Sequence, residues 1–184
     1  MRIISGSQRG RKLLSLEGQH TRPTSEKVKE ALFSIIQFEI EGRRVLDLFA
    51  GSGQLGLEAL SRGARECVFV DNDRNAMQII RQNAEKCGFT SMSRFLQNDY
   101  STVLKRTGEK FDIILIDPPY ASSYYHNSLK LLSTFDILAQ NGIIIFESES
   151  DMELPESVGT IQRVKEYKYG RTKLTVYRNK TADD

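Results

Sequence analysis

The hydrophobic and polar positions of the chain follow two alternating patterns. Short apolar runs typical of buried strands are separated by stretches in which apolar residues recur every three or four positions, as in amphipathic helices. The predicted strands are residues 44–49, 66–71, 93–99, 111–117 and 142–148, and the predicted helices between them are 56–64, 74–88, 101–108 and 122–135. This regular alternation predicts an α/β fold with a doubly wound, mostly parallel, Rossmann-like sheet.

The segments on either side of this alternation predict additions to the core. Thr24 or Ser25 can cap a helix within residues 22–40, and the apolar positions of that helix share one face. These positions are Val28, Ala31, Leu32, Ile35 and Ile36. Residues 160–178 alternate around a turn at Gly170, which predicts an antiparallel C-terminal hairpin and a sheet of seven strands.

Length and composition are typical of one domain. The chain has 184 residues, of which 39% are apolar and 27% charged, and its apolar runs are too short to cross a membrane. We expect a single domain over 1–184, with a basic N-terminal hairpin over 1–20 and a core over 21–184. Cys67 and Cys87 lack the spacing of a disulfide framework or metal site, and no signal peptide is visible. We therefore expect a cytoplasmic monomer without a metal.

The net charge of +2 conceals two basic ends. Residues 1–16 contain four basic residues and no acid, and residues 163–180 contain seven basic residues against one acid. If the two ends meet in space, they form a basic face suited to a polyanion. Solvated surface charge, or protection of an edge strand, is the alternative interpretation.

A glycine motif follows the first predicted strand. Gly51, Gly53 and Gly56 have GxGxxG spacing between a strand and a helix, where glycine permits a tight turn and close approach of a ligand to backbone N–H groups. Asp71 ends the next strand, where a carboxylate can accept hydrogen bonds from both hydroxyls of a ribose. These features predict a nucleoside cofactor without distinguishing a nicotinamide dinucleotide from other nucleosides.

Asp47 favours a cationic cofactor. It precedes Gly51 at the end of the first strand, where it would repel a pyrophosphate and attract the sulfonium and ammonium groups of S-adenosylmethionine. The structural alternative is a strand-end carboxylate that caps a nearby turn. Asp99, after the third strand, can bind the adenine amine, although it could equally be a turn residue.

A second motif ends the fourth predicted strand, which enters the run Asp117, Pro118, Pro119 and Tyr120. In a doubly wound sheet this strand returns beside the first, so its loop and the Gly51 loop should share one crevice. The prolines have no N–H and Asp117 adds an acceptor, which suits an exocyclic amine of a nucleobase. Tyr120 offers a stacking face and Asp117 a proton acceptor, whereas a rigid strand-ending turn is the alternative.

The motifs DLFAGSG, FVDND, QNDY and IDPPY, in this order, resemble those of class I S-adenosylmethionine-dependent amino-methyltransferases. Over nearly the whole chain, RIISGSQRGRKL, RPTSEKVKEALFSII and YGRTKLTVYR resemble the RsmD family, bacterial enzymes that methylate guanine N2 in 16S ribosomal RNA. The resemblance implies a Rossmann-like methyltransferase sheet. It also implies methyl transfer from S-adenosylmethionine to a guanine of that RNA, within a small-subunit particle.

The same resemblance implies roles for individual residues. The cofactor-binding residues would be Arg22, Thr24, Asp47, Phe49, Ala50, Gly51, Ser52, Gly53, Asp71, Asn72, Asp99 and Tyr100. The catalytic residues that hold a flipped-out guanine would be Asp117, Pro118, Pro119 and Tyr120. The RNA-binding residues would be Arg2, Arg9, Arg11, Lys12, Arg171 and Lys173.

Three other functions share part of this pattern. An adenine-N6 methyltransferase acting on DNA or RNA also carries DPPY, but the chain has no unassigned stretch long enough for the target-reading module of the DNA enzymes. An NAD-dependent oxidoreductase explains the glycine motif and Asp71, and leaves Asp47 and DPPY unexplained. A noncatalytic RNA-binding module explains only the basic ends.

Overall fold

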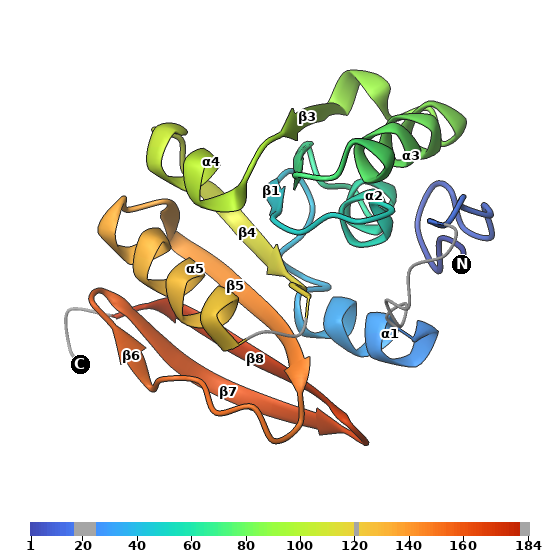
Figure 1. The fold of residues 1–184 in the computed structure, drawn as a ribbon. Helices are drawn as coiled ribbons and strands as arrows, with labels where there is room; N and C mark the ends of the chain where they lie inside the picture. The colour runs from blue at the N-terminus through green and yellow to red at the C-terminus, as the bar shows by residue number, and fades with distance from the viewer. Residues whose placement is uncertain (17–24, 120–121, 181–184) are drawn as a thin grey trace.

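The computed structural model describes residues 1–16, 25–119 and 122–180, and its centre is an eight-stranded sheet (Figure 1). The strands are β1 (Arg44–Asp47), β2 (Glu66–Asp71), β3 (Ser93–Gln97), β4 (Phe111–Ile116), β5 (Leu138–Glu149), β6 (Ser157–Val158), β7 (Ile161–Tyr169) and β8 (Thr172–Asn179). Their order is β3-β2-β1-β4-β5-β8-β7-β6. The first five strands in this order are parallel and the last three are antiparallel, which confirms the predicted fold class and the C-terminal hairpin.

Two details of the sheet differ from the prediction. The strand count is eight rather than seven, because two-residue β6 pairs with the start of β7 and is too short to produce a periodic pattern. The N-terminal segment turns back on itself as predicted. It forms one isolated antiparallel bridge, between Arg2 and Lys12, instead of a regular hairpin.

Helices cover both faces of the sheet. α1 (Glu26–Ile35), α2 (Gln54–Ser61) and α3 (Arg74–Lys86) share one buried cluster, which also receives Ile3 and Leu13 from the N-terminal segment. The cluster on the other face contains α4 (Tyr100–Arg106) and α5 (Ser122–Thr134). A short 3-10 helix, η1 (Thr90–Met92), leads into β3. Among the helices of the described ranges, none is both long and apolar enough to span a membrane.

The buried face of α1 is rotated from the predicted one. The Ser25 hydroxyl accepts the Val28 N–H, which makes Ser25 the N-cap. Lys29 and Phe33 are buried, whereas the predicted Ala31 and Ile35 are only half-buried. A buried lysine becomes acceptable because its ammonium has partners, a carboxylate and a backbone carbonyl described below. Periodicity cannot signal this, because it counts lysine as a polar position.

The course of the chain places β1 beside β4. The chain moves from β1 through β2 to the edge strand β3, and then crosses back to lay β4 on the other side of β1. Asp47, the last residue of β1, pairs in register with Leu115 near the end of β4. The loops that follow these two strands are therefore neighbours, as expected at the switch point of a doubly wound sheet.

The three motif glycines have different physical roles. Gly51 and Gly53 have φ angles of 55° and 79°, which lie in the left-handed region that favours glycine. Gly56 has no such angle, but a Cβ there would lie 2.3 Å from the Phe69 ring and 2.6 Å from the Cys67 sulfur. Gly56 therefore lets α2 approach β2 closely, so the motif shapes both the loop and the contact of its helix with the sheet.

We expect Gly56→Ala to lower the free energy of unfolding by about 1–3 kcal/mol, because its methyl group overpacks the helix–strand contact. Gly88→Ala is the control, since Gly88 has a positive φ and open space around its would-be Cβ. That change should cost only about 1 kcal/mol of backbone strain. Urea unfolding checks both values, and equal losses would contradict the packing role of Gly56.

Candidate functional site

A cavity of about 720 Å³ lies at the carboxyl ends of β1, β2 and β4. The glycine loop after β1, the start of α3 and the segment after β4 all contribute to its wall. Five aspartates line it: Asp47, Asp71, Asp73, Asp99 and Asp117. None of the described lining residues is a lysine, an arginine or a histidine. The cavity is thus suited to a ligand that carries positive charge rather than to a pyrophosphate.

Asp47 is fully enclosed at the end of β1, with 1% of its surface exposed. Its Oδ2 accepts the backbone N–H of Gly56 at 2.9 Å. Gly53, at the N-cap of α2, has no side chain that could accept a hydrogen bond from the first turn of the helix. The Asp47 carboxylate, at the end of β1, caps the helix instead. Burial raises the pKa of Asp47 to about 7, with smaller contributions from Asp117 and Asp71, while the Gly56 N–H acts against this rise. The turn-capping interpretation of Asp47 is confirmed, and its position in the cavity wall also leaves it available to a ligand.

Asp71 holds the glycine loop and the start of α3. Its Oδ2 accepts the Gly51 N–H at 2.8 Å and its Oδ1 accepts the Asp73 N–H at 2.9 Å. The N-cap of α3 is Asp73 and not Asp71, so Asp71 contributes to the start of this helix only through its hydrogen bond from the Asp73 N–H. Burial raises the pKa of Asp71, although the hydrogen bonds from Asp73 and Gly51 oppose this. A carboxylate has about four acceptor positions, so each oxygen of Asp71 can still accept from a ribose hydroxyl.

Three aromatic rings form one wall of the cavity. The ring centroids of Phe49 and Tyr100 are 5.0 Å apart, and Tyr124 lies edge-on to both rings, at 5.6 and 5.7 Å. Phe49 and Tyr100 were predicted, whereas Tyr124 was missed because it comes from α5, beyond the DPPY motif. Its aromatic neighbours in the run SSYYH were the signal that could have found it. The flat faces of this wall suit a purine ring.

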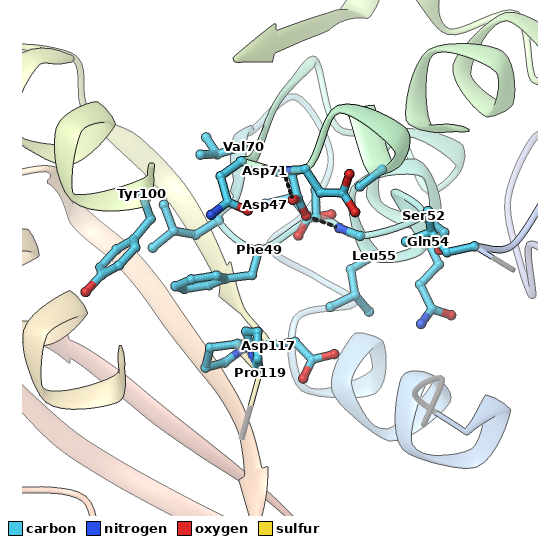
Figure 2. A pocket seen from close by; sticks show the side chains of 18 of the residues that line it. Asp47, Phe49, Ser52, Gln54, Leu55, Val70, Asp71, Tyr100, Asp117 and Pro119 are labelled. Atoms are coloured by element: carbon cyan, nitrogen blue, oxygen red, sulfur yellow. Dashed lines mark hydrogen bonds between the residues drawn. The ribbon is translucent and has the colours of Figure 1, made fainter. Parts of the chain in front are cut away.

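The two motifs meet as predicted. Asp117 and Pro118 follow β4 and line the same cavity as Asp47 and the glycine loop. Figure 2 shows Phe49 between the Asp47 and Asp71 pair on one side and Asp117 with Pro119 on the other. The strand therefore delivers a carboxylate and two residues without N–H groups to the side of the cavity away from Asp71.

Some of the remaining predicted site residues line the cavity, and others lie outside the described residues. Ala50, Gly51, Ser52, Asn72 and Asp99 line the cavity. Asp99 also caps α4, because its Oδ1 accepts the Ser101 N–H at 2.9 Å. The described residues do not include Arg22, Thr24 and Tyr120, which stay predictions. Besides Tyr124, the lining residues that the sequence did not indicate are Met1, Ser15, Leu16, Leu48, Gln54, Leu55, Val70, Asp73, Ala76 and Asn98.

Five of the six predicted RNA-binding residues are exposed, and one is buried. Arg9, Arg11, Lys12 and Arg171 are exposed. Arg2 is also exposed, but its guanidinium forms a bidentate pair with Glu26 at 2.9 and 3.0 Å.

The prediction that Lys173 binds RNA is wrong. Only 4% of it is exposed, and its ammonium donates to the Met152 carbonyl at 2.6 Å and pairs with Glu166 at 2.9 Å. Because this ammonium is buried and paired, the structure does not support an RNA contact by Lys173.

Comparisons with known proteins agree with this arrangement. Residues 1–178 match the family model described as "Conserved hypothetical protein 95", which represents the RsmD family. The chain belongs to the RsmD family. A Bacillus subtilis protein named as a candidate rRNA methyltransferase, YlbH, is 39% identical over 98% of this chain and 100% of its own. Escherichia coli ribosomal RNA small subunit methyltransferase D is 36% identical over 84% of this chain and 78% of its own.

A solved structure is similar to this protein over nearly its whole length. A candidate methyltransferase YhhF from Escherichia coli superposes with a TM-score of 0.89, at 30% identity over 98% of both chains. The likeness therefore extends over the N-terminal segment and the C-terminal hairpin as well as the central sheet.

The raised pKa of Asp47 makes its effect on stability depend on pH. This carboxyl ionises near pH 4 in an unfolded chain and near pH 7 in the folded protein. Unfolding releases its proton between these values, so Asp47 lowers stability progressively as the pH rises from about 4 to about 7.

Asp47→Asn removes this titration and keeps an oxygen that can accept the Gly56 N–H. We compare the free energy of unfolding of the variant with that of the unmodified protein at each pH. The difference, variant minus unmodified protein, should increase by roughly 2 kcal/mol from about pH 5 to pH 8. Urea unfolding at the two pH values checks this. Asp151→Asn, at an exposed position, is the control, and the same change in both variants would contradict the assignment to Asp47.

Proposed function

We propose that this protein transfers a methyl group from S-adenosylmethionine to the exocyclic N2 amine of a guanine in 16S ribosomal RNA. The proposed substrate is RNA within a small-subunit particle, and the proposed target is the guanine at position 966, which the resemblance to the RsmD family implies. The observation that carries the proposal is the single cavity that joins the glycine loop to the Asp117-Pro118-Pro119 segment. Membership in a family whose curated members are named as ribosomal RNA methyltransferases supports the substrate class.

The cofactor fits the acidic part of the cavity. The Asp71 carboxylate is positioned to accept from the ribose hydroxyls, and the aromatic wall of Phe49, Tyr100 and Tyr124 is suited to the adenine. Asp47 and the Gly51 loop then face the methionine end, where a positive charge stabilises the ionised form of Asp47. Bound S-adenosylmethionine supplies an electrophilic methyl carbon on its sulfonium.

The segment after β4 positions the amine. An exocyclic amine has two N–H bonds, and Asp117 with the Pro118 carbonyl presents acceptors and no competing proline N–H. Accepting both hydrogens turns the nitrogen lone pair out of the plane of the base and toward the methyl carbon, which is a gain from orientation alone. As the new carbon–nitrogen bond formed, the carbon–sulfur bond would break with its electron pair going to sulfur, so S-adenosylhomocysteine would leave and N2 would carry an extra proton. Asp117 is the carboxylate positioned to accept it.

The RNA approaches from the face that carries the N-terminal segment. Arg9, Arg11 and Lys12 are exposed there, and their segment forms part of the cavity wall through Ser15 and Leu16. Cationic side chains at this border bind phosphates of any sequence and direct a base into the cavity.

The reaction is tested with radiolabelled S-adenosylmethionine and three substrates in parallel: assembled small subunits, naked 16S ribosomal RNA and duplex DNA. After digestion to nucleosides we expect the label in N2-methylguanosine. We expect Asp117→Ala to lower the rate of labelling by about 100-fold or more, because it removes an amine acceptor and the proton acceptor. Calorimetry should show unchanged cofactor affinity in this variant, and Asp151→Ala should label normally. Label confined to N6-methyladenosine would instead identify an adenine methyltransferase.

A charge-reversal experiment tests the RNA surface. We expect the combined change of Arg9, Arg11 and Lys12 to Glu to weaken RNA binding and to reduce the salt dependence by about one unit of log–log slope for each lost phosphate contact. The control reverses three exposed residues at the end of α4, which packs on the opposite face of the sheet, and just before β4: Lys105, Arg106 and Lys110. A salt slope that changes equally in both variants would refute the proposed surface.

A further inference from the structure

Residues 1–16, called the strap here, pack along the face of the sheet that carries α2 and α3. Ile3 and Leu13 anchor the strap in the core, with 0% and 7% of their surfaces exposed. Met1, Ser15 and Leu16 reach the cavity and form part of its wall. The strap therefore carries exposed basic side chains in its middle and cavity-lining residues at both ends.

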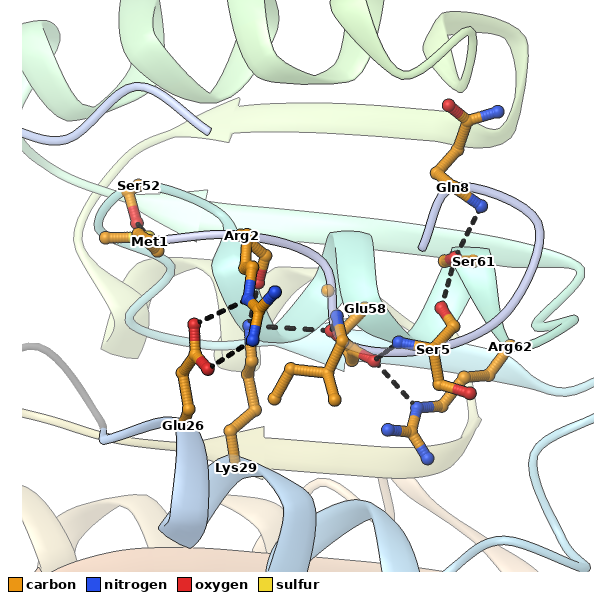
Figure 3. A network of polar contacts seen from close by, with 12 residues as sticks. Met1, Arg2, Ser5, Gln8, Glu26, Lys29, Ser52, Glu58, Ser61 and Arg62 are labelled. Carbon is orange, nitrogen blue, oxygen red and sulfur yellow. Dashed lines mark hydrogen bonds and ion pairs between the residues drawn. The ribbon is translucent and has the colours of Figure 1, made fainter. Parts of the chain in front are cut away.

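A buried ionic cluster fixes the first half of the strap to α1 and α2. The Glu58 carboxylate, fully buried on α2, accepts the N–H groups of Ile4 and Ser5 at 2.8 and 3.0 Å. Lys29 on α1 pairs with Glu58 at 3.4 Å and donates to the Arg2 carbonyl at 2.7 Å. Figure 3 shows these contacts converging on Glu58. Each buried charge has partners, as burial of an ion pair requires.

In the second half of the strap, the core contact of Leu13 is joined by hydrogen bonds from a side chain of α3, Asn83, which is completely buried. Asn83 Oδ1 accepts the Leu14 N–H at 2.8 Å, and Asn83 Nδ2 donates to the Leu14 carbonyl at 3.0 Å. Nδ2 also donates to the Ser52 carbonyl at 2.9 Å. Both hydrogens of the amide are therefore used, one on the strap and one on the glycine loop.

Besides its link to the strap through Asn83, Ser52 contacts the strap directly. Its hydroxyl lies 3.1 Å from the Met1 sulfur. The loop that supplies Gly51 and Ser52 to the cavity thus contacts the strap near both of its ends. The donor that loop and strap share is Asn83 Nδ2, so a shift of the Ser52 carbonyl would alter the hydrogen bond of the same amide group that holds Leu14.

We propose that Asn83 is a positioning residue that couples the glycine loop to the strap. Asn83 does not line the cavity, so it acts on a bound cofactor through the residues that its amide holds: Ser52 of the loop, and Leu14 beside the lining residues Ser15 and Leu16. A planar amide suits this role because one rigid group offers the acceptor that Leu14 N–H needs and the two donors that the carbonyls need. A cofactor that fixes the loop then restrains the strap. By reciprocity, a ligand that fixes the strap tightens cofactor binding.

Asn83→Asp tests this with minimal change of shape. The variant keeps an oxygen for the Leu14 N–H but presents a second oxygen to the carbonyls of Leu14 and Ser52, so the link is broken. The control is Gln82→Ala, an exposed neighbour on the same helix. Both variants are studied well below their unfolding temperatures, which are measured first.

The decisive measurement is amide hydrogen exchange of the peptide that contains residues 1–16, with and without S-adenosylmethionine. In the unmodified protein and in Gln82→Ala, we expect the cofactor to slow this exchange roughly fivefold or more, and in Asn83→Asp we expect almost no effect. A side chain that only stabilised the fold would leave the cofactor dependence intact. Equal cofactor dependence in all three proteins, or none in the unmodified protein, overturns the proposal.

A second measurement uses the proposed RNA substrate and therefore rests on the proposed function. We expect small subunits to tighten cofactor binding by roughly fivefold or more in the unmodified protein, and this gain to disappear in Asn83→Asp. In the variant, the KM for the cofactor should rise while kcat at saturation stays within about twofold. Failure of the unmodified protein to bind small subunits would refute the proposed function alone. Persistence of the gain in Asn83→Asp would refute the coupling alone.

Discussion

The hydrogen bond from the Gly56 amide to the buried carboxylate of Asp47 determines where the site lies. α2 begins after a left-handed glycine that offers no side-chain cap, so the free N–H groups of its first turn need an acceptor from elsewhere. Asp47 supplies that acceptor from the end of β1, and the intervening loop is thereby held at the switch point. The carboxylate remains difficult to ionise in this position, which makes it responsive to a positive charge in the cavity.

Much of the fold could be predicted because each strand and helix carries its own periodic pattern. Strands covered on both faces are continuous apolar runs, and the rule for doubly wound sheets then brings Asp47 and Asp117 together without any knowledge of side-chain contacts. Lys29 and Lys173 could not be predicted. Each is buried only because a distant segment supplies a carboxylate and a carbonyl, and such a partnership leaves no periodic signal. Asn83 was missed for a similar reason, whereas Tyr124 was missed because it lies on α5, beyond the DPPY motif, although the run SSYYH carried a signal for it.

The two ends of the parallel strands differ in how their charges are satisfied. At the amino ends, Arg44 contacts Glu66 and Glu109 at 3.2 and 3.3 Å, and Arg94 contacts Glu109 at 2.9 Å. Acids and bases alternate there, so their fields largely cancel. At the carboxyl ends, the aspartates of the cavity have no lysine, arginine or histidine beside them among the described lining residues. The acids at the amino ends are thus paired with cationic side chains, whereas Asp47, Asp71 and Asp99 of the cavity accept hydrogen bonds from backbone N–H groups instead.

The brevity of β6 has a consequence for self-association. β6 covers only the first two residues of β7, so most of the outer edge of β7 has no neighbouring strand within the described chain. An open edge of this length invites pairing with a second molecule. The edge is interrupted by a register shift between Arg163 and Lys165, and both Lys165 and Lys168 are exposed along it. Lysine side chains and an irregular hydrogen-bond ladder on an edge strand are features that disfavour pairing with a further strand.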